Sequence, residues 1–151
     1  MKRILFVCLG NICRSPLAQA IAEDFALKHH LDLEINSAGT GHWHVGEAPC
    51  ENSILVAQQR GLNIAHYKAQ QVTKKDFSYY DVIVGLDQSN IQNLKALGCK
   101  NPLKLGDFGF NGEDVPDPYF FDGFEGFDKV FEMINTSVKL LIDDYYQTKC
   151  L

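Results

Sequence analysis

Residues 3–17, RILFVCLGNICRSPL, join a short apolar run to a glycine-containing loop and the beginning of a helix. The branched and aromatic side chains of residues 3–8 are typical of a strand that is buried on both faces, as in parallel sheets. Ser15 and Pro16 suit the N-cap and first turn of the helix, because a serine hydroxyl caps free N–H groups and proline needs no N–H there. The stretch therefore predicts a strand, a loop and a helix, which together open an α/β fold.

The same alternation of strands and helices continues along the chain. Short apolar runs predict strands, and apolar residues at helical spacing predict helices. The expected strands cover residues 32–37, 81–86 and 103–105, and the expected helices cover residues 49–60, a short segment from Thr73, 87–97 and 127–145. This order predicts a doubly wound α/β sheet of about four parallel strands with helices on both faces, and residues 1–151 are expected to form one domain.

Composition limits the classes of function. The chain has 151 residues, of which 46% are hydrophobic, and this suits a compact folded protein rather than a disordered one. No apolar run reaches the roughly 20 residues of a membrane span, and the first run is too short for a signal peptide. The net charge is -5 without a block of lysine or arginine, which argues against nucleic-acid and membrane partners. We therefore expect a cytoplasmic protein that binds any anion at a local site.

The cysteines and histidines do not form the pattern of a disulfide framework or a metal site. His42 and His44 have the spacing of a possible metal pair, but no further ligand pattern supports a metal. The number of cysteines is odd, and no C-x-x-C spacing occurs. We expect mostly free thiols at the five positions, which are Cys8, Cys13, Cys50, Cys99 and Cys150.

The loop after the first strand has the features of a phosphate site with a nucleophile. In open α/β folds ligands bind beyond the carboxyl ends of the strands, and N–H groups at a helix N-terminus attract anions. Such groups also stabilise a thiolate, so Cys8 is expected to be a nucleophile at neutral pH, although a cysteine there can also be a packing residue. Arg14 can bind two oxygens of a tetrahedral anion, and Ser15 can stabilise the sulfur as a leaving group. Gly10 permits a close turn, and Asn11 tolerates a left-handed backbone.

The sequence VCLGNICRSP at 7–16 resembles the signature of the low-molecular-weight protein tyrosine phosphatases. The resemblance implies a phosphomonoesterase without metal or cofactor, which acts on phosphotyrosine in proteins and on small aryl phosphates. It assigns Cys8 as the nucleophile that forms a phosphocysteine, Arg14 as the phosphate clamp and Asp117 as the general acid. The other residues of the implied phosphate-binding loop are Leu9, Gly10, Asn11, Ile12, Cys13 and Ser15. Four further segments resemble the family in the same order, so nearly the whole chain is covered: SAGTG at 37–41, WHVG at 43–46, DVIVGLDQSN at 81–90 and VPDPY at 115–119.

A general acid is also expected from the chemistry alone, because phenolate is a poor leaving group without a proton. Pro116 and Pro118 restrict the backbone on both sides of Asp117 and would orient its carboxyl group. The alternative is that Pro-Asp-Pro is only a rigid turn. The other acidic candidates in the same long loop are Glu113, Asp114 and Asp122.

Aromatic residues near these segments predict the walls of the substrate pocket. A narrow, deep slot would stack a phenyl ring and would keep the shorter phosphoserine away from the thiolate. The resemblance places Trp43 and Tyr119 at the entrance. Phe120 stands where the family often has a second tyrosine, which leaves the substrate preference open. Each ring could instead belong to the core, because aromatic residues are plentiful in this chain.

Three residues match family positions that support the phosphate loop, namely Ser37, His66 and Asp87. The resemblance implies that the first two brace Asn11 and Ser15 from behind. Asp87 has a second interpretation of nearly equal weight, because an aspartate at that point also suits the N-cap of the following helix.

Two cysteines near the loop leave the regulation of the protein open. Cys13 resembles a family thiol that could trap an oxidised Cys8 in a reversible disulfide, but simple packing explains it equally well. The sequence APCEN at 48–52 lacks an arginine that is common in the family. The role of Cys50 in this segment stays open.

Two other functions compete with the phosphatase. An arsenate reductase on the same fold would need a close pair of redox cysteines on a flexible segment, which Cys50, Cys99 and Cys150 do not form in the sequence. A non-catalytic phosphate-binding module would not need a nucleophile, a clamp and an acid together. We therefore expect a protein tyrosine phosphatase, whose substrate protein and oligomeric state the sequence does not name.

Overall fold

The sheet at the centre of the molecule is parallel, as the sequence predicts. The computed structural model describes residues 2–118 and 123–147. Within this part the sheet contains four strands in the order β2-β1-β3-β4, and every neighbouring pair is parallel. The strands are β1 (Lys2–Cys8), β2 (Leu33–Gly39), β3 (Val82–Gly85) and β4 (Leu103–Lys104).

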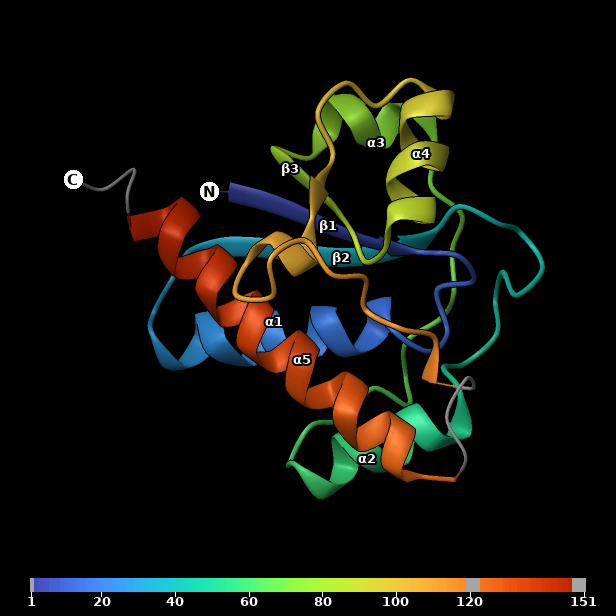
Figure 1. Cartoon of the computed structure of the whole chain (residues 1–151), viewed down its shortest axis with the longest axis vertical. Helices are drawn as coiled ribbons and strands as arrows, with labels where there is room; N and C mark the ends of the chain where they lie inside the picture. The colour runs from blue at the N-terminus through green and yellow to red at the C-terminus, as the bar shows by residue number, and fades with distance from the viewer. Residues whose placement is uncertain (1, 119–122, 148–151) are drawn as a thin grey trace.

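Helices cover both faces of this sheet, so the doubly wound α/β fold is confirmed. Figure 1 shows α1, α2 and α5 on one side of the strands and α3 and α4 on the other. None of the described helices is long and apolar enough to cross a membrane. The helices are α1 (Ser15–Lys28), α2 (Glu51–Gln59), α3 (Lys74–Tyr79), α4 (Gln88–Leu97) and α5 (Glu125–Ile142), with a 3-10 turn η1 (Leu105–Asp107) and a π-helical turn η3 (Asp143–Gln147).

The side chains of β1 alternate between two hydrophobic cores, one on each face of the sheet. Ile4 and Phe6 belong to the larger core, which α1 and α5 complete. Leu5 and Val7 belong to the smaller core, together with residues of α3, β3 and α4. Because both faces of β1 are buried, its sequence is continuously apolar instead of alternating with polar residues.

The start of α1 differs from the prediction. Arg14, not Ser15, occupies the N-cap position, and the Arg14 side chain makes no capping hydrogen bond. Ser15 is the first helical residue, and its hydroxyl contacts the side chains of Cys8 and Asn11. A tertiary contact therefore uses the hydroxyl group that the local pattern assigned to helix capping.

The predicted ends of α3 and α4 are present. Thr73 and Asp76 form a capping box at the start of α3. At the start of α4, the Asp87 carboxylate accepts a hydrogen bond from the backbone N–H of Asn90 at 2.8 Å. Gly98 ends α4 with a φ of 111°, a left-handed conformation that glycine adopts without steric cost.

The carboxyl ends of β1 and β2 bring two loops together. Cys8 lies beside Gly39 in the strand register, and the backbone N–H of Thr40 donates to the Cys8 carbonyl oxygen at 3.0 Å. A Cβ atom on Gly39 would stand only 2.7 Å from the carbonyl oxygen of Leu9. Glycine at this position therefore allows the loop after β1 to pack closely against the end of β2.

The two neighbouring leucines near the end of α5 provide a test of the larger core. Leu141 is fully buried, whereas Leu140 is 43% exposed. We expect Leu141→Ala to lower the free energy of unfolding by about 2–5 kcal/mol, because it leaves a cavity in the core. Leu140→Ala is the matched control and should cost about 0.5 kcal/mol or less. Urea unfolding measures both values, and equal losses would contradict the described packing of α5.

Candidate active site

Cys8 lies at the carboxyl end of β1 and is only 2% exposed. Its sulfur lies 3.0 Å from the hydroxyl oxygen of Ser15 and accepts a hydrogen bond from the backbone N–H of Asn11 at 3.3 Å. When Cys8 is a thiolate it has no proton to give, so Ser15 must be the donor in their contact. Both neighbours then stabilise negative charge on the sulfur.

The side chain of Asn11 is fixed by hydrogen bonds on both sides of its amide group. Its nitrogen donates to the hydroxyl oxygens of Ser15 at 2.8 Å and Ser37 at 2.9 Å, and its oxygen accepts from the backbone N–H of Gln70 at 3.0 Å. The hydroxyl of Ser37 in turn donates to Gln19 at 2.7 Å. Asn11 has a φ of 59°, the left-handed conformation that the sequence analysis expected of it.

Behind the loop, the structure brings together Ser37 and Asn11 but not His66. The His66 ring is exposed and meets the Tyr67 ring edge to face, with centroids 4.7 Å apart. Among the described residues, the expected contact of His66 to the loop is replaced by Gln70, whose side chain also donates to the carbonyl oxygen of Ser37 at 2.9 Å. The supporting role expected of His66 stays a prediction, and no local sequence signal marked Gln70, because its backbone N–H makes the contact to Asn11.

Arg14 is buried beside the loop and is oriented by two partners from distant parts of the chain. Its Nη1 atom donates to the carboxylate of Asp87 at 2.7 Å and to the carbonyl oxygen of Val115 at 2.9 Å. The side chain of Asp87 also caps α4 through its other oxygen. Both interpretations of Asp87 are therefore correct, since one carboxylate orients the arginine and begins the helix.

A pocket of about 220 Å³ opens above Cys8. Asp117 reaches it from the loop before α5, and Trp43 reaches it from the loop after β2, where its side chain is 65% exposed. His44 also lines the pocket, although no sequence motif placed it there, and its ring contacts Glu47. Among residues 2–118 and 123–147, the lining is Cys8, Leu9, Gly10, Ile12, Cys13, Arg14, Trp43, His44 and Asp117.

The loop that carries Asp117 is held to the rest of the site by its preceding residues. The Asp114 carboxylate forms an ion pair with Lys104 at 2.8 Å and accepts from the backbone N–H of Gln88 at 2.9 Å. The hydrogen bond from Lys104 lowers the pKa of Asp114, which keeps this carboxyl group ionised and unsuited to donate a proton. Val115 donates its backbone N–H to the carbonyl oxygen of Leu86 at 2.9 Å.

Among the acidic candidates of this loop, Asp117 is the one that the structure brings to the pocket. Glu113 is exposed and does not line the pocket. The remaining candidate, Asp122, lies outside the described residues. The same is true of Tyr119 and Phe120, so their expected place in the pocket wall stays a prediction.

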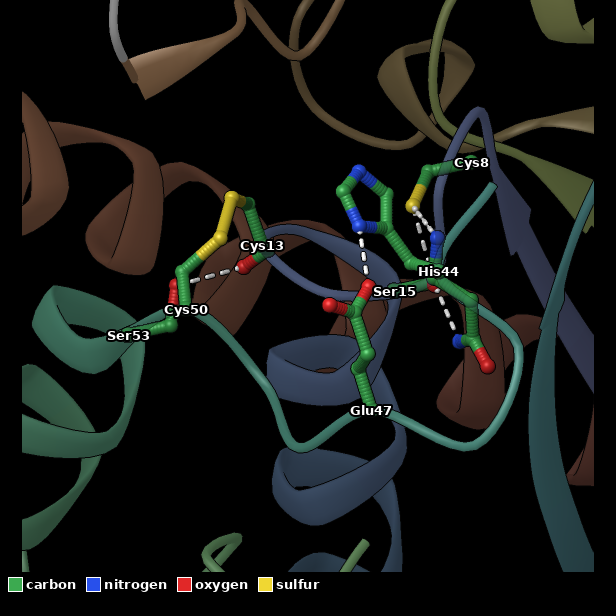
Figure 2. Close-up of a disulfide and its surroundings, with 8 residues drawn as sticks. Cys8, Cys13, Ser15, His44, Glu47, Cys50 and Ser53 are labelled. Atoms are coloured by element: carbon green, nitrogen blue, oxygen red, sulfur yellow. Dashed lines mark hydrogen bonds and ion pairs between the residues drawn. A yellow bond between two sulfur atoms is a disulfide. The ribbon is translucent and has the colours of Figure 1, made fainter. Parts of the chain in front are cut away.

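The cysteines differ from the expectation of mostly free thiols. Cys13 and Cys50 form a disulfide, with Cα atoms 5.2 Å apart, whereas Cys8 and Cys99 are free and buried. Figure 2 shows the disulfide beside the phosphate loop. No local sequence pattern indicates this pair, because 37 positions separate its members. Within residues 2–118 and 123–147, no group of three or more His, Cys, Asp or Glu side chains could hold a metal ion.

A second and larger cavity, of about 590 Å³, lies at the amino ends of β3 and β4 and is lined in part by Asp81, Cys99 and Asn101. Burial raises the pKa of the Cys99 thiol, which favours the neutral form. A neutral thiol is a poor nucleophile, and this end of the sheet is opposite the end where ligands bind in such folds. The pocket above Cys8 is therefore the candidate active site.

Comparison with known proteins agrees with this geometry. The model of the family described as low molecular weight phosphotyrosine protein phosphatase matches residues 3–149. A Drosophila melanogaster protein, low molecular weight phosphotyrosine protein phosphatase 1, is 38% identical over 139 residues, which cover 87% of this chain and 89% of the relative.

Two solved structures extend the comparison to the fold. The protein tyrosine phosphatase from Entamoeba histolytica superposes with a TM-score of 0.91 at 32% identity, over 99% of each chain. A Drosophila arginine phosphatase superposes with a TM-score of 0.87 at 31% identity, over 96% of this chain and 98% of that one. The match of the family model and the identity to its members show that this chain belongs to the low molecular weight phosphotyrosine protein phosphatase family.

Proposed function

We propose that this chain hydrolyses phosphotyrosine in proteins through a phosphocysteine intermediate on Cys8. The observation that carries the proposal is that Cys8, Arg14 and Asp117 line the same pocket. A nucleophile, a cation that binds phosphate and a carboxyl group thus meet at one cavity. The chemistry uses side chains of residues 1–151 alone, which we treat as one catalytic domain without metal or cofactor.

The first step transfers the phosphoryl group to the enzyme. The Cys8 thiolate attacks phosphorus, and the bond between phosphorus and the phenolic oxygen breaks. Arg14 and the backbone N–H groups of the loop stabilise the charge on the phosphoryl oxygens, and Asp87 keeps the guanidinium in position. Asp117 donates its proton to the phenolic oxygen, so tyrosine leaves as a neutral phenol.

The second step releases phosphate and restores the nucleophile. Asp117, now a carboxylate, accepts a proton from a water molecule that attacks the phosphocysteine. The bond between phosphorus and sulfur breaks, and Cys8 leaves as a thiolate. Ser15 and the backbone N–H of Asn11 stabilise this leaving group through the contacts that they make with the sulfur in the free enzyme.

The pocket walls favour an aromatic leaving group. Leu9, Ile12 and Trp43 present apolar surface to the cavity, which suits the face of a phenyl ring better than the cationic side chain of phosphoarginine. Phosphoserine lacks the length to bring its phosphate to the floor of such a pocket. We further propose a cytoplasmic location, because the reaction requires Cys8 as a free thiol and reducing compartments maintain that state.

The role of Cys8 is tested with p-nitrophenyl phosphate, and the role of Asp117 with phenyl phosphate, both in the presence of EDTA. We expect Cys8→Ser to abolish turnover and EDTA to leave the wild-type rate unchanged. Asp117→Asn should lower kcat by about 10²–10⁴-fold with aryl phosphates of basic phenols, because their leaving oxygen needs the proton. Inhibition by EDTA, or full activity of Cys8→Ser, would exclude the mechanism.

Two substitutions of Asp87 separate its effect on Arg14 from its effect on α4. Both Asp87→Ser and Asp87→Ala remove the ion pair, so kcat/KM should fall equally in both, by up to about a hundredfold if the guanidinium moves by about 1 Å. Serine still caps the helix, so the alanine variant should lose about 1 kcal/mol more in the free energy of unfolding. Kinetics and urea unfolding measure the two effects. Wild-type kinetics in Asp87→Ser would show that the carboxylate acts only on the helix.

Matched peptides test the substrate class. A peptide that carries phosphotyrosine should be hydrolysed with a much higher kcat/KM than the same peptide with phosphoserine or phosphoarginine, because only the aryl group reaches the pocket floor along apolar walls. Release of inorganic phosphate measures all three rates. Equal rates for phosphotyrosine and phosphoserine would contradict the deep pocket, and a preference for phosphoarginine would replace the proposed substrate class.

A further inference from the structure

The disulfide between Cys13 and Cys50 ties the phosphate loop to the start of α2 (Figure 2). Two hydrogen bonds beside it do not depend on the sulfur atoms. The backbone N–H of Cys50 donates to the carbonyl oxygen of Ile12 at 2.7 Å, and the Ser53 hydroxyl donates to the carbonyl oxygen of Cys13 at 2.8 Å. These contacts keep the two cysteines adjacent when the disulfide is open, so the effective concentration of one thiol at the other is high.

Cys13 also lines the same pocket as Cys8. A disulfide from Cys13 to Cys8 and one from Cys13 to Cys50 would have different consequences. A bond from Cys8 to Cys13 would draw the Cys8 sulfur away from Ser15 and Asn11, which it contacts as a thiol. A bond from Cys13 to Cys50 leaves both contacts in place, as the structure has them.

We propose that Cys13 and Cys50 form a redox-active pair. After peroxide oxidises Cys8, thiol–disulfide exchange leaves the disulfide between Cys13 and Cys50 and restores Cys8 as a free thiolate. The co-reactants are hydrogen peroxide as oxidant and a dithiol as reductant. The inference rests on the proposed role of Cys8 as the nucleophile, since a reactive thiolate is also the sulfur that peroxide oxidises first. Cys50, which the proposed hydrolysis does not use, acquires a role in this way.

The transfer takes three steps. The Cys8 thiolate attacks one oxygen of hydrogen peroxide, the O–O bond breaks, and Cys8 becomes a sulfenic acid while hydroxide leaves. The Cys13 thiolate attacks the Cys8 sulfur, the S–O bond breaks, and a second hydroxide leaves as the Cys8–Cys13 disulfide forms. The Cys50 thiolate then attacks the Cys13 sulfur, and Cys8 leaves as a thiolate. In total, two thiols and one peroxide give one disulfide and two water molecules.

The last step favours the product that the structure contains. Cys8 is a good leaving group because Ser15 and Asn11 stabilise its thiolate, and a thiol that leaves as a stabilised anion is displaced faster. The oxidised protein therefore keeps a free nucleophile, and the dithiol later reduces Cys13–Cys50 by the same exchange chemistry. Oxidation stops at a reversible disulfide and does not proceed to the irreversible sulfinic acid.

The experiment starts from fully reduced protein, which receives one equivalent of hydrogen peroxide before catalase removes the excess. Activity with p-nitrophenyl phosphate is measured before and after, without a reductant, and peptide mapping identifies the disulfide. Wild-type protein should keep most of its activity and contain Cys13–Cys50. Cys50→Ser should lose most of its activity, contain Cys8–Cys13 and recover with dithiothreitol. Serine suits this position, because Cys50 is the N-cap residue of α2.

Cys99→Ser is the matched control, because Cys99 is also a buried cysteine but lines a different cavity, and it should behave like the wild type. Cys50→Ala should lose activity and contain Cys8–Cys13 after peroxide, as Cys50→Ser does. This second variant shows whether the loss comes from the missing thiol and not from the new serine hydroxyl. The activity before peroxide separates this inference from the proposed function, because all of these variants should be active then. A lasting Cys8–Cys13 bond in the wild type, or equal survival of the wild type and Cys50→Ser, would overturn the inference.

Discussion

The candidate active site depends most on the hydrogen bonds of the Asn11 side-chain amide. With a left-handed backbone, this residue turns the loop back so that its own N–H points at the Cys8 sulfur. Its side chain joins Ser15, Ser37 and the backbone of Gln70, which come from a helix, a strand and a connecting segment. Both donor hydrogens of the amide and its oxygen are hydrogen-bonded, and these contacts hold the loop in the described shape. A preorganised loop of this kind stabilises charge without the cost of reorienting dipoles during the reaction.

A second set of contacts connects the phosphate loop to the segment that carries the proposed acid. Arg14 donates to Asp87 at the start of α4 and to the carbonyl oxygen of Val115, two residues before Asp117. Asp114 adds an ion pair with Lys104 and lies against the same helix start. The arginine that is proposed to hold the phosphate therefore also positions the acid loop. Hydrogen bonds and one ion pair therefore connect the phosphate loop, the start of α4 and the segment before Asp117.

Several features could be predicted because they depend on residues that are close in sequence. The buried strand at β1, the capping box of α3 and the glycine end of α4 each follow from a pattern of a few residues. The prediction that Ser15 caps α1 was wrong because it depends on a residue farther away in the sequence. The Ser15 hydroxyl has a partner in Cys8, seven residues earlier, and a local rule for helix starts does not consider such a partner. Gln70 escaped notice because backbone groups carry no sequence signal.

The sequence by itself determined the parallel sheet, the left-handed turn at Asn11 in the first loop and the candidate nucleophile, clamp and acid. These follow from hydrophobic periodicity and from short motifs whose residue types match one chemistry. Only the tertiary structure decided that Asp87 contacts both Arg14 and the start of α4, that His44 lines the pocket, and that Cys13 pairs with Cys50. Each of these contacts joins residues that are far apart in the chain, and their distance is set by how the strands and helices pack, which no local pattern encodes.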